Sequence, residues 1–320
     1  MEQVAETENN DIKLEETGKK KRGSQHSRIF RILCIVLASI FAFLTACALF
    51  LIIAESVVDR TARVTPSYEK IDISELINKE EWTEEEYDIL RHQTGLAPSV
   101  LDGFRGDKRL LEFQNALFFK GEIYHEAASY VTPHDRLHDP DAGKEYTSAN
   151  DYDAPLVPLE AGDVIVTSTC HTFGWRNGHA ALVTSATSTG GFVLESITIG
   201  YDSEITSSGV LWFRRSANFL VLRLKNVDKE ARAEIAKKAS EELVGIPYSL
   251  KIGLFTKKDQ CADGRTPVGT NCSHLVWQAF KNAGYDIDSD GGPVCTGRDI
   301  SKCDLFEVIQ VYGFDVDKRW

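Results

Sequence analysis

Positive charge is scarce over most of this 320-residue sequence. Of its 36 lysine and arginine residues, 7 stand in the first 31 positions, together with 6 of its 48 acidic residues. The remainder therefore carries 29 basic and 42 acidic side chains. No basic stripe interleaved with aromatic residues occurs there, and an acidic surface repels phosphate backbones. The sequence thus argues against nucleic acid as a partner.

Charge is absent altogether from residues 32–54, a run of 23 residues. A helix of this length crosses a hydrocarbon core of about 30 Å. Six of these seven basic residues stand just before the run and acidic residues follow it, so the positive-inside rule predicts a single-pass cell-membrane protein with a cytoplasmic N-terminus. The basic residues are Lys19, Lys20, Lys21, Arg22, Arg28 and Arg31, and the acidic ones are Glu55 and Asp59.

Two other readings of this apolar run remain open. A secretory signal usually has a shorter apolar core and a small-x-small cleavage site, and no such site follows here. Leu44 to Cys47 resemble a lipoprotein cleavage box, which would place a lipid on Cys47, but the apolar run continues beyond it to Ala54. We therefore expect an uncleaved anchor, with everything after it outside the cell.

The rest of the chain divides by its patterning, and it has no internal repeats or low-complexity tracts. We predict a cytoplasmic tail over residues 1–31, the membrane helix over 32–54, a stalk over 55–81, a helical region with a loop over 82–150, and a main domain over 151–320. In the helical region, Thr83 is the expected N-cap of a helix that ends near Gly95. Residues 132–150 are rich in Pro, Asp, Gly and His, which is typical of a loop.

The main domain begins with short β-rich runs bounded by turn residues. These runs are Asp163 to Thr167, His179 to Ser185, Gly191 to Ile197, Val210 to Phe213 and Phe219 to Leu224. Asp228 and Asn271 are each the expected N-cap of a helix, and Phe306 to Tyr312 is predicted to return as a last strand. The pattern indicates an α+β fold with an antiparallel sheet and packed helices.

Two residues suggest thiol chemistry. Cys272 starts a predicted helix and His179 starts a predicted strand, and helix N-terminal amides and a nearby imidazolium both stabilise a thiolate. A buried cysteine on an apolar helix face can equally serve as a small hydrophobe. The outer part holds an odd number of cysteines, so at least one stays outside any disulfide, and Cys272 is the candidate. The other four would pair as Cys295 with Cys303 and Cys170 with Cys261, although sequence does not fix connectivity.

Four short motifs occur in a suggestive order. They are Gly162-Asp163-Val164-Ile165-Val166, then Gly178-His179-Ala180-Ala181-Leu182-Val183, then Gly245-Ile246-Pro247-Tyr248, and last Asn271-Cys272-Ser273. Together they resemble the NlpC-like cell-wall cysteine peptidases and amidases, in the circularly permuted YiiX/YycO-like branch. The resemblance spans residues 160–283 and leaves residues 55–150 uncovered. His274 departs from the pattern, because the branch more often has an acidic residue there.

The resemblance implies a permuted papain-like fold and a role for each matching residue. Cys272 would be the nucleophile, His179 the general base and Glu195 the group that orients the imidazole, while Tyr248 and Ser273 would lie at the substrate. Backbone N–H groups at the start of the Cys272 helix would bind the oxyanion. The implied activity is hydrolysis of an amide bond in peptidoglycan peptides or a related substrate, with no cofactor.

Other interpretations stay open at this point. The same residues would serve a thioester-dependent acyltransferase or lipid deacylase, and a degenerate site would leave a wall-binding module. Glu195 could be a solvated strand residue and Tyr248 could simply pack in a turn. His171 fits a rim residue better than the base. A group of histidines and aspartates in the loop could bind a metal, but we expect these side chains to be solvated. They are His134, Asp135, His138, Asp139 and Asp141.

Overall fold

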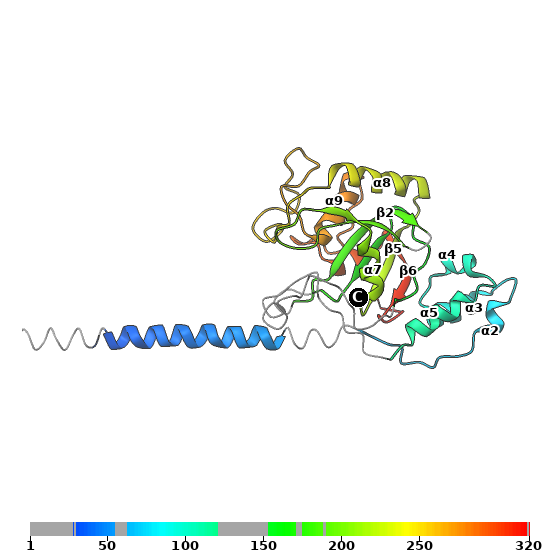
Figure 1. Ribbon diagram of the computed structural model, residues 1–320, viewed down its shortest axis with the longest axis horizontal. Coiled ribbons are helices and arrows are strands. Elements are labelled where there is room, and N and C mark those ends of the chain that lie inside the picture. The colour runs from blue at the N-terminus through cyan, green and yellow to red at the C-terminus, as the bar shows by residue number, and fades with distance from the viewer. Residues whose placement is uncertain are drawn as a thin grey trace, which may run out of the picture. The chain divides into compact units, whose positions relative to one another are not determined.

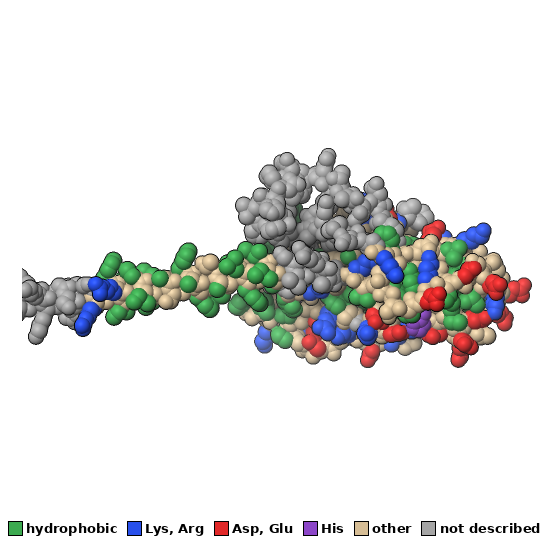
Figure 2. All heavy atoms as spheres, turned by 90° about the horizontal axis from the view of Figure 1, so that it is seen from below, with side chains coloured by type: hydrophobic (Ala, Val, Ile, Leu, Met, Phe, Trp, Pro, Cys, Tyr) green, Lys and Arg blue, Asp and Glu red, His purple; other side chains and the backbone are tan. Residues whose placement is uncertain are grey.

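The computed structural model describes residues 28, 30–54, 63–120, 153–170, 175–187, 190–318 and 320. The chain forms two compact units, residues 1–56 and 57–320. In its described residues the first unit has the helix Phe30–Ala54, of 25 residues with a mean hydropathy of 2.8. Hydrophobic side chains are exposed along this helix (Figure 2). It is long and apolar enough to cross a membrane, and is compatible with an anchor or a signal sequence.

The second unit is built on a six-stranded antiparallel sheet with the order β4-β3-β2-β1-β5-β6. The strands are β1 Val164–Thr167, β2 His179–Thr187, β3 Gly190–Glu195, β4 Glu204–Thr206, β5 Phe219–Leu224 and β6 Phe306–Tyr312. Strand β1 lies between β2 and β5, with Val164 opposite both Leu182 and Leu222. The predicted α+β class with an antiparallel sheet is confirmed, and β5 and β6 have the predicted limits.

Helices pack on both faces of this sheet (Figure 1). Alternate strand residues divide between two cores, because side chains of a strand point to opposite faces. Val164 and Val166 pack with α8 (Lys229–Glu242), α9 (Cys272–Asn282) and α10 (Gly297–Lys302). Ile165 packs in the other core, which contains residues of α3 (Glu84–Thr94), α4 (Pro98–Leu101), the 3-10 helix η1 (Asp102–Phe104), α5 (Arg109–Leu117) and α7 (Ser208–Arg215).

The helix ends follow the predicted capping residues. Thr83 and Glu86 form a reciprocal capping box at the start of α3, which ends at Gly95 with a φ of 75°. The side chain of Asp228 accepts a hydrogen bond from the N–H of Ala231 at 2.7 Å. The side chain of Asn271 accepts one from the N–H of His274 at 3.1 Å. Each cap satisfies an amide that has no partner within its helix.

Two segments differ from the sequence-based expectations. The predicted strand over residues 210–213 is wrong, because this apolar run is the centre of helix α7, and periodicity alone cannot separate a short buried strand from a helix. Residues 63–81, assigned to a stalk, pack on the domain. Arg63 donates to the carbonyls of Ala116 and Ala217, at 2.8 Å each, and Ile73 and Ile77 are buried in the core. A four-residue helix, α2 (Ser74–Ile77), lies in this segment.

Candidate active site

The structure brings His179 and Glu195 into direct contact. His179 begins β2 and Glu195 ends the neighbouring strand β3. The Nε2 atom of His179 lies 2.9 Å from Oε2 of Glu195, and both side chains are buried. The other carboxylate oxygen, Oε1, accepts a hydrogen bond from the hydroxyl of Thr206 on β4. Glu195 is therefore held from two sides and is not a solvated strand residue.

Cys272 lies at the first position of helix α9, where amide N–H groups have no helical partner. Its sulfur is buried, 3.8 Å from the carbonyl oxygen of Gly178, the residue before His179. The backbone amides of Ala180 and Ser273 also face the sulfur and lower its pKa. Because Nε2 of His179 faces Glu195, Nδ1 is the ring nitrogen left to face this sulfur.

Cys272 and His179 stabilise each other's charged forms by more than their burial destabilises them. Burial opposes the charged form of His179, but the thiolate of Cys272 and then Glu195 raise its pKa to about 9. Burial likewise raises the pKa of Cys272, but the imidazolium and the nearby amides pull it below its ordinary value. Both effects favour a thiolate–imidazolium pair at neutral pH.

Helix α7 packs two aromatic rings on the imidazole of His179. The ring of Phe213 stacks on it with centroids 5.5 Å apart, and that of Trp212 meets it edge-on at 5.3 Å. These contacts leave the ring few alternative orientations. The apolar pattern of residues 210–213 predicted a strand and gave no sign of this role.

Two glycines allow these elements to approach each other. A Cβ atom on Gly209, in the first turn of α7, would lie 2.6 Å from Oε1 of Glu195 and 2.4 Å from Val193. Gly178 has a φ of 71°, and a Cβ there would meet the ring of Trp320 at 1.9 Å. A side chain at either position would displace a residue that holds the site.

The Gly245-Ile246-Pro247-Tyr248 segment runs beside the residues that precede Cys272. The N–H of Thr270 donates to the carbonyl of Pro247 at 2.9 Å, and the N–H of Ser249 donates to the carbonyl of Thr270 at 2.6 Å. Burial raises the pKa of Tyr248, and so do the charges of Cys272 and Cys170. Tyr248 also forms a β-bridge with Thr270, two residues before Cys272.

Two polar residues of α9 have structural contacts. The hydroxyl of Ser273 donates to the carbonyl of Cys295 at 2.9 Å. Ser273 therefore faces the sulfur of Cys272 with its backbone amide and not with its hydroxyl. His274 is buried, with Nδ1 2.9 Å from the hydroxyl of Thr270 and Nε2 2.8 Å from the carbonyl of Lys258. Burial lowers the pKa of His274 to about 4. The residue that departs from the family pattern is thus a neutral link between α9 and a neighbouring loop.

The predicted disulfides are absent, since no disulfide joins any of the seven cysteines, all of which lie in the described ranges. The thiol of Cys261 donates to Gln278 at 3.7 Å, and that of Cys303 to the carbonyl of Asp286 at 3.9 Å. Cys295 and Cys303 belong to one buried cluster, but their thiols have different acceptors, Thr296 and Asp286. Proximity in sequence was therefore a poor guide to pairing.

The first of the quoted motifs has a structural use. Asp163 is buried and accepts two hydrogen bonds from Arg223, at 2.8 and 2.7 Å, and one from the N–H of Glu160 at 2.8 Å. These bonds fix the start of β1 against β5. His171 lies outside the described residues, and so do His134, Asp135, His138, Asp139 and Asp141.

Comparisons with known proteins add little to this geometry. No family model matches the sequence, and no curated protein matches it. The crystal structure of the metalloprotein yiiX from Escherichia coli O157:H7 is similar at a TM-score of 0.35 and 13% identity, over 47% of this chain and 96% of that one. A likeness of this strength carries no argument about function, which has to be argued from the site itself.

Proposed function

We propose that this protein is a membrane-anchored cysteine hydrolase that cleaves an amide bond through Cys272, His179 and Glu195. The observation that supports this most directly is the buried chain of contacts from Thr206 through Glu195 to His179 and on to the thiol of Cys272. A nucleophile, a base and a group that orients the base are the parts that covalent acyl transfer needs.

The reaction follows from these positions. The thiolate attacks the carbonyl carbon of the amide and forms a C–S bond, and the resulting oxyanion is bound by backbone N–H groups of the first turn of α9. The imidazolium of His179 gives its proton to the leaving amine as the C–N bond breaks. Water then attacks the thioester, loses a proton to His179, and regenerates the thiolate.

The substrate class comes from the sequence resemblance, which implies peptidoglycan peptides and the permuted papain-like fold. The apolar helix, as an anchor, would hold the domain at the membrane. An acidic domain also matches a substrate that is not a polyanion.

A test uses the full chain in detergent with muropeptides as substrate. Liquid chromatography with mass spectrometry should detect amide cleavage by the wild type. The change Cys272→Ala should abolish it, while the matched control Cys261→Ala, outside the site, should leave it unchanged. Cleavage that persists in Cys272→Ala would contradict the proposal.

A second candidate, acyl transfer from a lipid through the same thioester, is favoured by exposed apolar residues near the site. Ile199 and Tyr201 are 65% and 64% exposed, and the carbonyl of Tyr201 accepts a hydrogen bond from the N–H of Tyr248 at 3.2 Å. Tyr248 itself forms a β-bridge with Thr270, two residues before Cys272. Incubation with phospholipid in place of muropeptides separates the two, since only the lipid reaction would release a lysolipid.

A further inference from the structure

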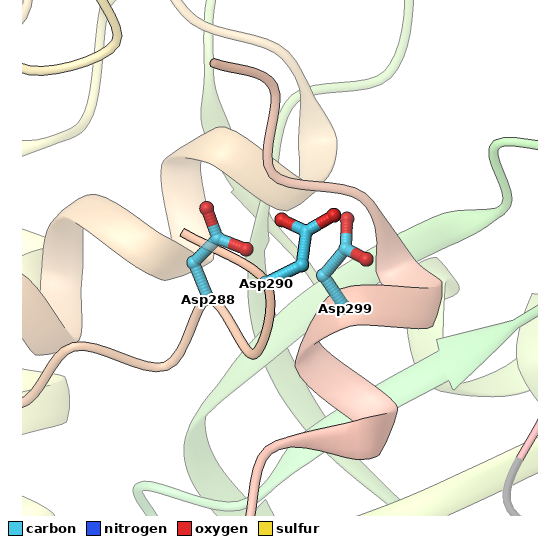
Figure 3. A group of neighbouring side chains, drawn as sticks. All are labelled: Asp288, Asp290 and Asp299. Carbon is cyan, nitrogen blue, oxygen red and sulfur yellow. The ribbon is translucent and has the colours of Figure 1, made fainter. Parts of the chain in front are cut away.

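Three aspartates converge behind the start of helix α9. Asp288 and Asp290 lie in the loop between α9 and α10, and Asp299 lies in the first turn of α10. One carboxylate oxygen from each lies within 4.8 Å of the other two. Figure 3 shows that the three side chains come together from the loop and the helix.

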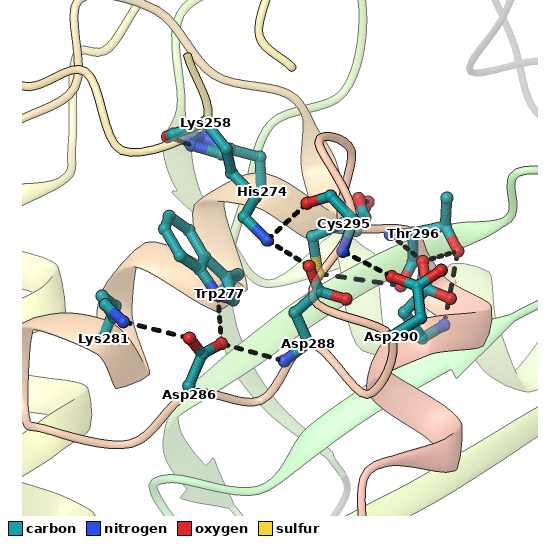
Figure 4. A network of polar contacts seen from close by, with 12 residues as sticks. Lys258, His274, Trp277, Lys281, Asp286, Asp288, Asp290, Cys295 and Thr296 are labelled. Carbon is teal, nitrogen blue, oxygen red and sulfur yellow. Dashed lines mark hydrogen bonds and ion pairs between the residues drawn. The ribbon is translucent and has the colours of Figure 1, made fainter.

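The negative charge of this cluster exceeds its positive charge. The ammonium of Lys258 donates to Oδ2 of Asp288 and to the carbonyl of Gly292, the latter at 2.8 Å (Figure 4). In the described part of the chain, neither Asp290 nor Asp299 forms an ion pair with a basic side chain.

A buried oxygen without a partner is an independent observation. The side chain of Asp288 is 0% exposed, and its second oxygen, Oδ1, has no hydrogen-bond donor among the described residues. A buried carboxylate oxygen left in this way costs free energy, and native structures pair such atoms with a donor or an ion. Lys258 occupies Oδ2, which leaves Oδ1 open to a donor or an ion.

We propose that Asp288, Asp290 and Asp299 bind one divalent cation, and that this cation is Ca²⁺. Calcium takes carboxylate oxygens at about 2.3–2.6 Å, so two of its ligands lie at most about 5 Å apart. The three aspartate oxygens, each within 4.8 Å of the others, are close enough together to bind one such ion. Three carboxylates and one ammonium leave two negative charges for the ion to balance. The thiol of Cys295 lies outside the group of ligand oxygens, which disfavours a thiophilic metal.

The sequence around the cluster has a matching pattern. Asp286, Asp288 and Asp290 alternate and are followed by Gly291, which has a φ of 63°, as in the Asp-x-Asp-x-Asp-Gly start of a calcium loop. The first aspartate is engaged elsewhere, by Trp277 at 2.8 Å and Lys281 at 3.0 Å. Asp299, from α10, supplies the third carboxylate in its place.

The ion would stabilise a segment that contacts the candidate active site from two sides. The carbonyl of Cys295 accepts the hydroxyl of Ser273, next to Cys272, and the N–H of Gly297 donates to the carbonyl of Asn177 at 3.3 Å. Asn177 precedes the Gly178-His179 pair. Calcium is therefore expected to stabilise the fold around the site without entering the reaction.

The test is calorimetric titration of the full chain in detergent with CaCl₂ after chelation, up to about 10 mM, which covers the weakest class of calcium sites. We expect one Ca²⁺ per chain and a higher Tm when it is bound. Asp290→Asn, at an exposed position, should weaken binding at least tenfold, and the control Glu234→Gln, on the exposed face of α8, should not.

Circular dichroism establishes that each variant folds. Absence of saturable binding by the wild type would overturn the proposal, and so would unchanged affinity in folded Asp290→Asn. Binding of Mg²⁺ as tightly as Ca²⁺ would overturn the assignment of the ion. Asp299→Asn gives an independent check, because asparagine retains the capping role of this residue while removing its charge.

Discussion

Replacing His179 by alanine should change the pH dependence of alkylation at Cys272. In the wild type the imidazolium stabilises the thiolate, so the pKa of the thiol lies below its ordinary value. The pKa of His179 is raised to about 9. The thiolate–imidazolium pair therefore persists at every pH between the lowered pKa of the Cys272 thiol and about 9. Above that pH the imidazole loses its proton while the thiolate remains.

The variant loses the imidazolium but keeps the burial, which raises the pKa of the thiol. A thiol with an ordinary pKa of about 8.5 is only about 1% thiolate at pH 6.5. A low-pKa thiolate is intrinsically less nucleophilic, which offsets nearly half of its advantage on a logarithmic scale. At a pH below both thiol pKa values, the net loss is therefore about threefold for each unit between them. In alkaline solution, where both proteins carry the thiolate, the variant should react faster.

The assay is timed alkylation with iodoacetamide from pH 5 to 10, with the adduct mapped to Cys272 by mass spectrometry. His92→Ala, in helix α3, is the control, because this histidine pairs with Asp317 outside the site. An alkylation profile that is the same in His179→Ala and the wild type would refute the ion pair. Burial raises the pKa of Cys261 and of Cys295, so both thiols should react more slowly than Cys272. Faster labelling of either one would also refute the ion pair.

Three further changes have defined outcomes. Glu195→Gln should lower kcat by about 10- to 100-fold, equivalent to about 1.4–2.8 kcal/mol, because glutamine still orients His179 but carries no charge. Loss as complete as in Cys272→Ala would contradict a role limited to orienting the base. Asp163→Asn should lower the free energy of unfolding by about 2–4 kcal/mol, because it leaves the partly buried Arg223 without its bidentate partner. An unchanged midpoint of unfolding in urea would contradict this. Protease added to wall-less cells should digest the domain and spare the N-terminal tail, and a protected domain would contradict the predicted topology.

Local signals in the sequence were sufficient for much of the fold. The caps at Thr83, Asp228 and Asn271 work over one helical turn, and each marks a helix start in the structure. The β-rich runs 219–224 and 306–312 are strands with the expected limits, because each is a short run bounded by residues that interrupt it. These features depend on neighbours in sequence, so they could be predicted.

Features that depend on distant contacts could not be predicted in the same way. Residues 210–213 are apolar throughout, and only the position of α7 against β3 decides that they form a helix. Strand β4 has three residues and pairs only with β3, so its sequence gives no periodic signal.

The candidate site was predictable in part. Its members were selected by residue type and motif order, and the structure places the side chains of Cys272, His179 and Glu195 together. The support from Thr206 and Gly209 had no sequence signal, because Thr206 acts from the neighbouring strand β4 and Gly209 acts from helix α7. The acidic cluster did have a sequence signal, which is the alternation of aspartates from Asp286 to Asp290.

The central claim is that Cys272 forms a covalent acyl intermediate, and acid-quenched mass spectrometry tests it most directly. The full chain is mixed with muropeptides, quenched within the first turnover, and digested for peptide mapping. We predict an acyl group of substrate mass on Cys272 that hydroxylamine removes, as expected for a thioester, and that Cys272→Ala lacks. Product formed without any acyl adduct on Cys272, or an adduct on another residue, would contradict the account.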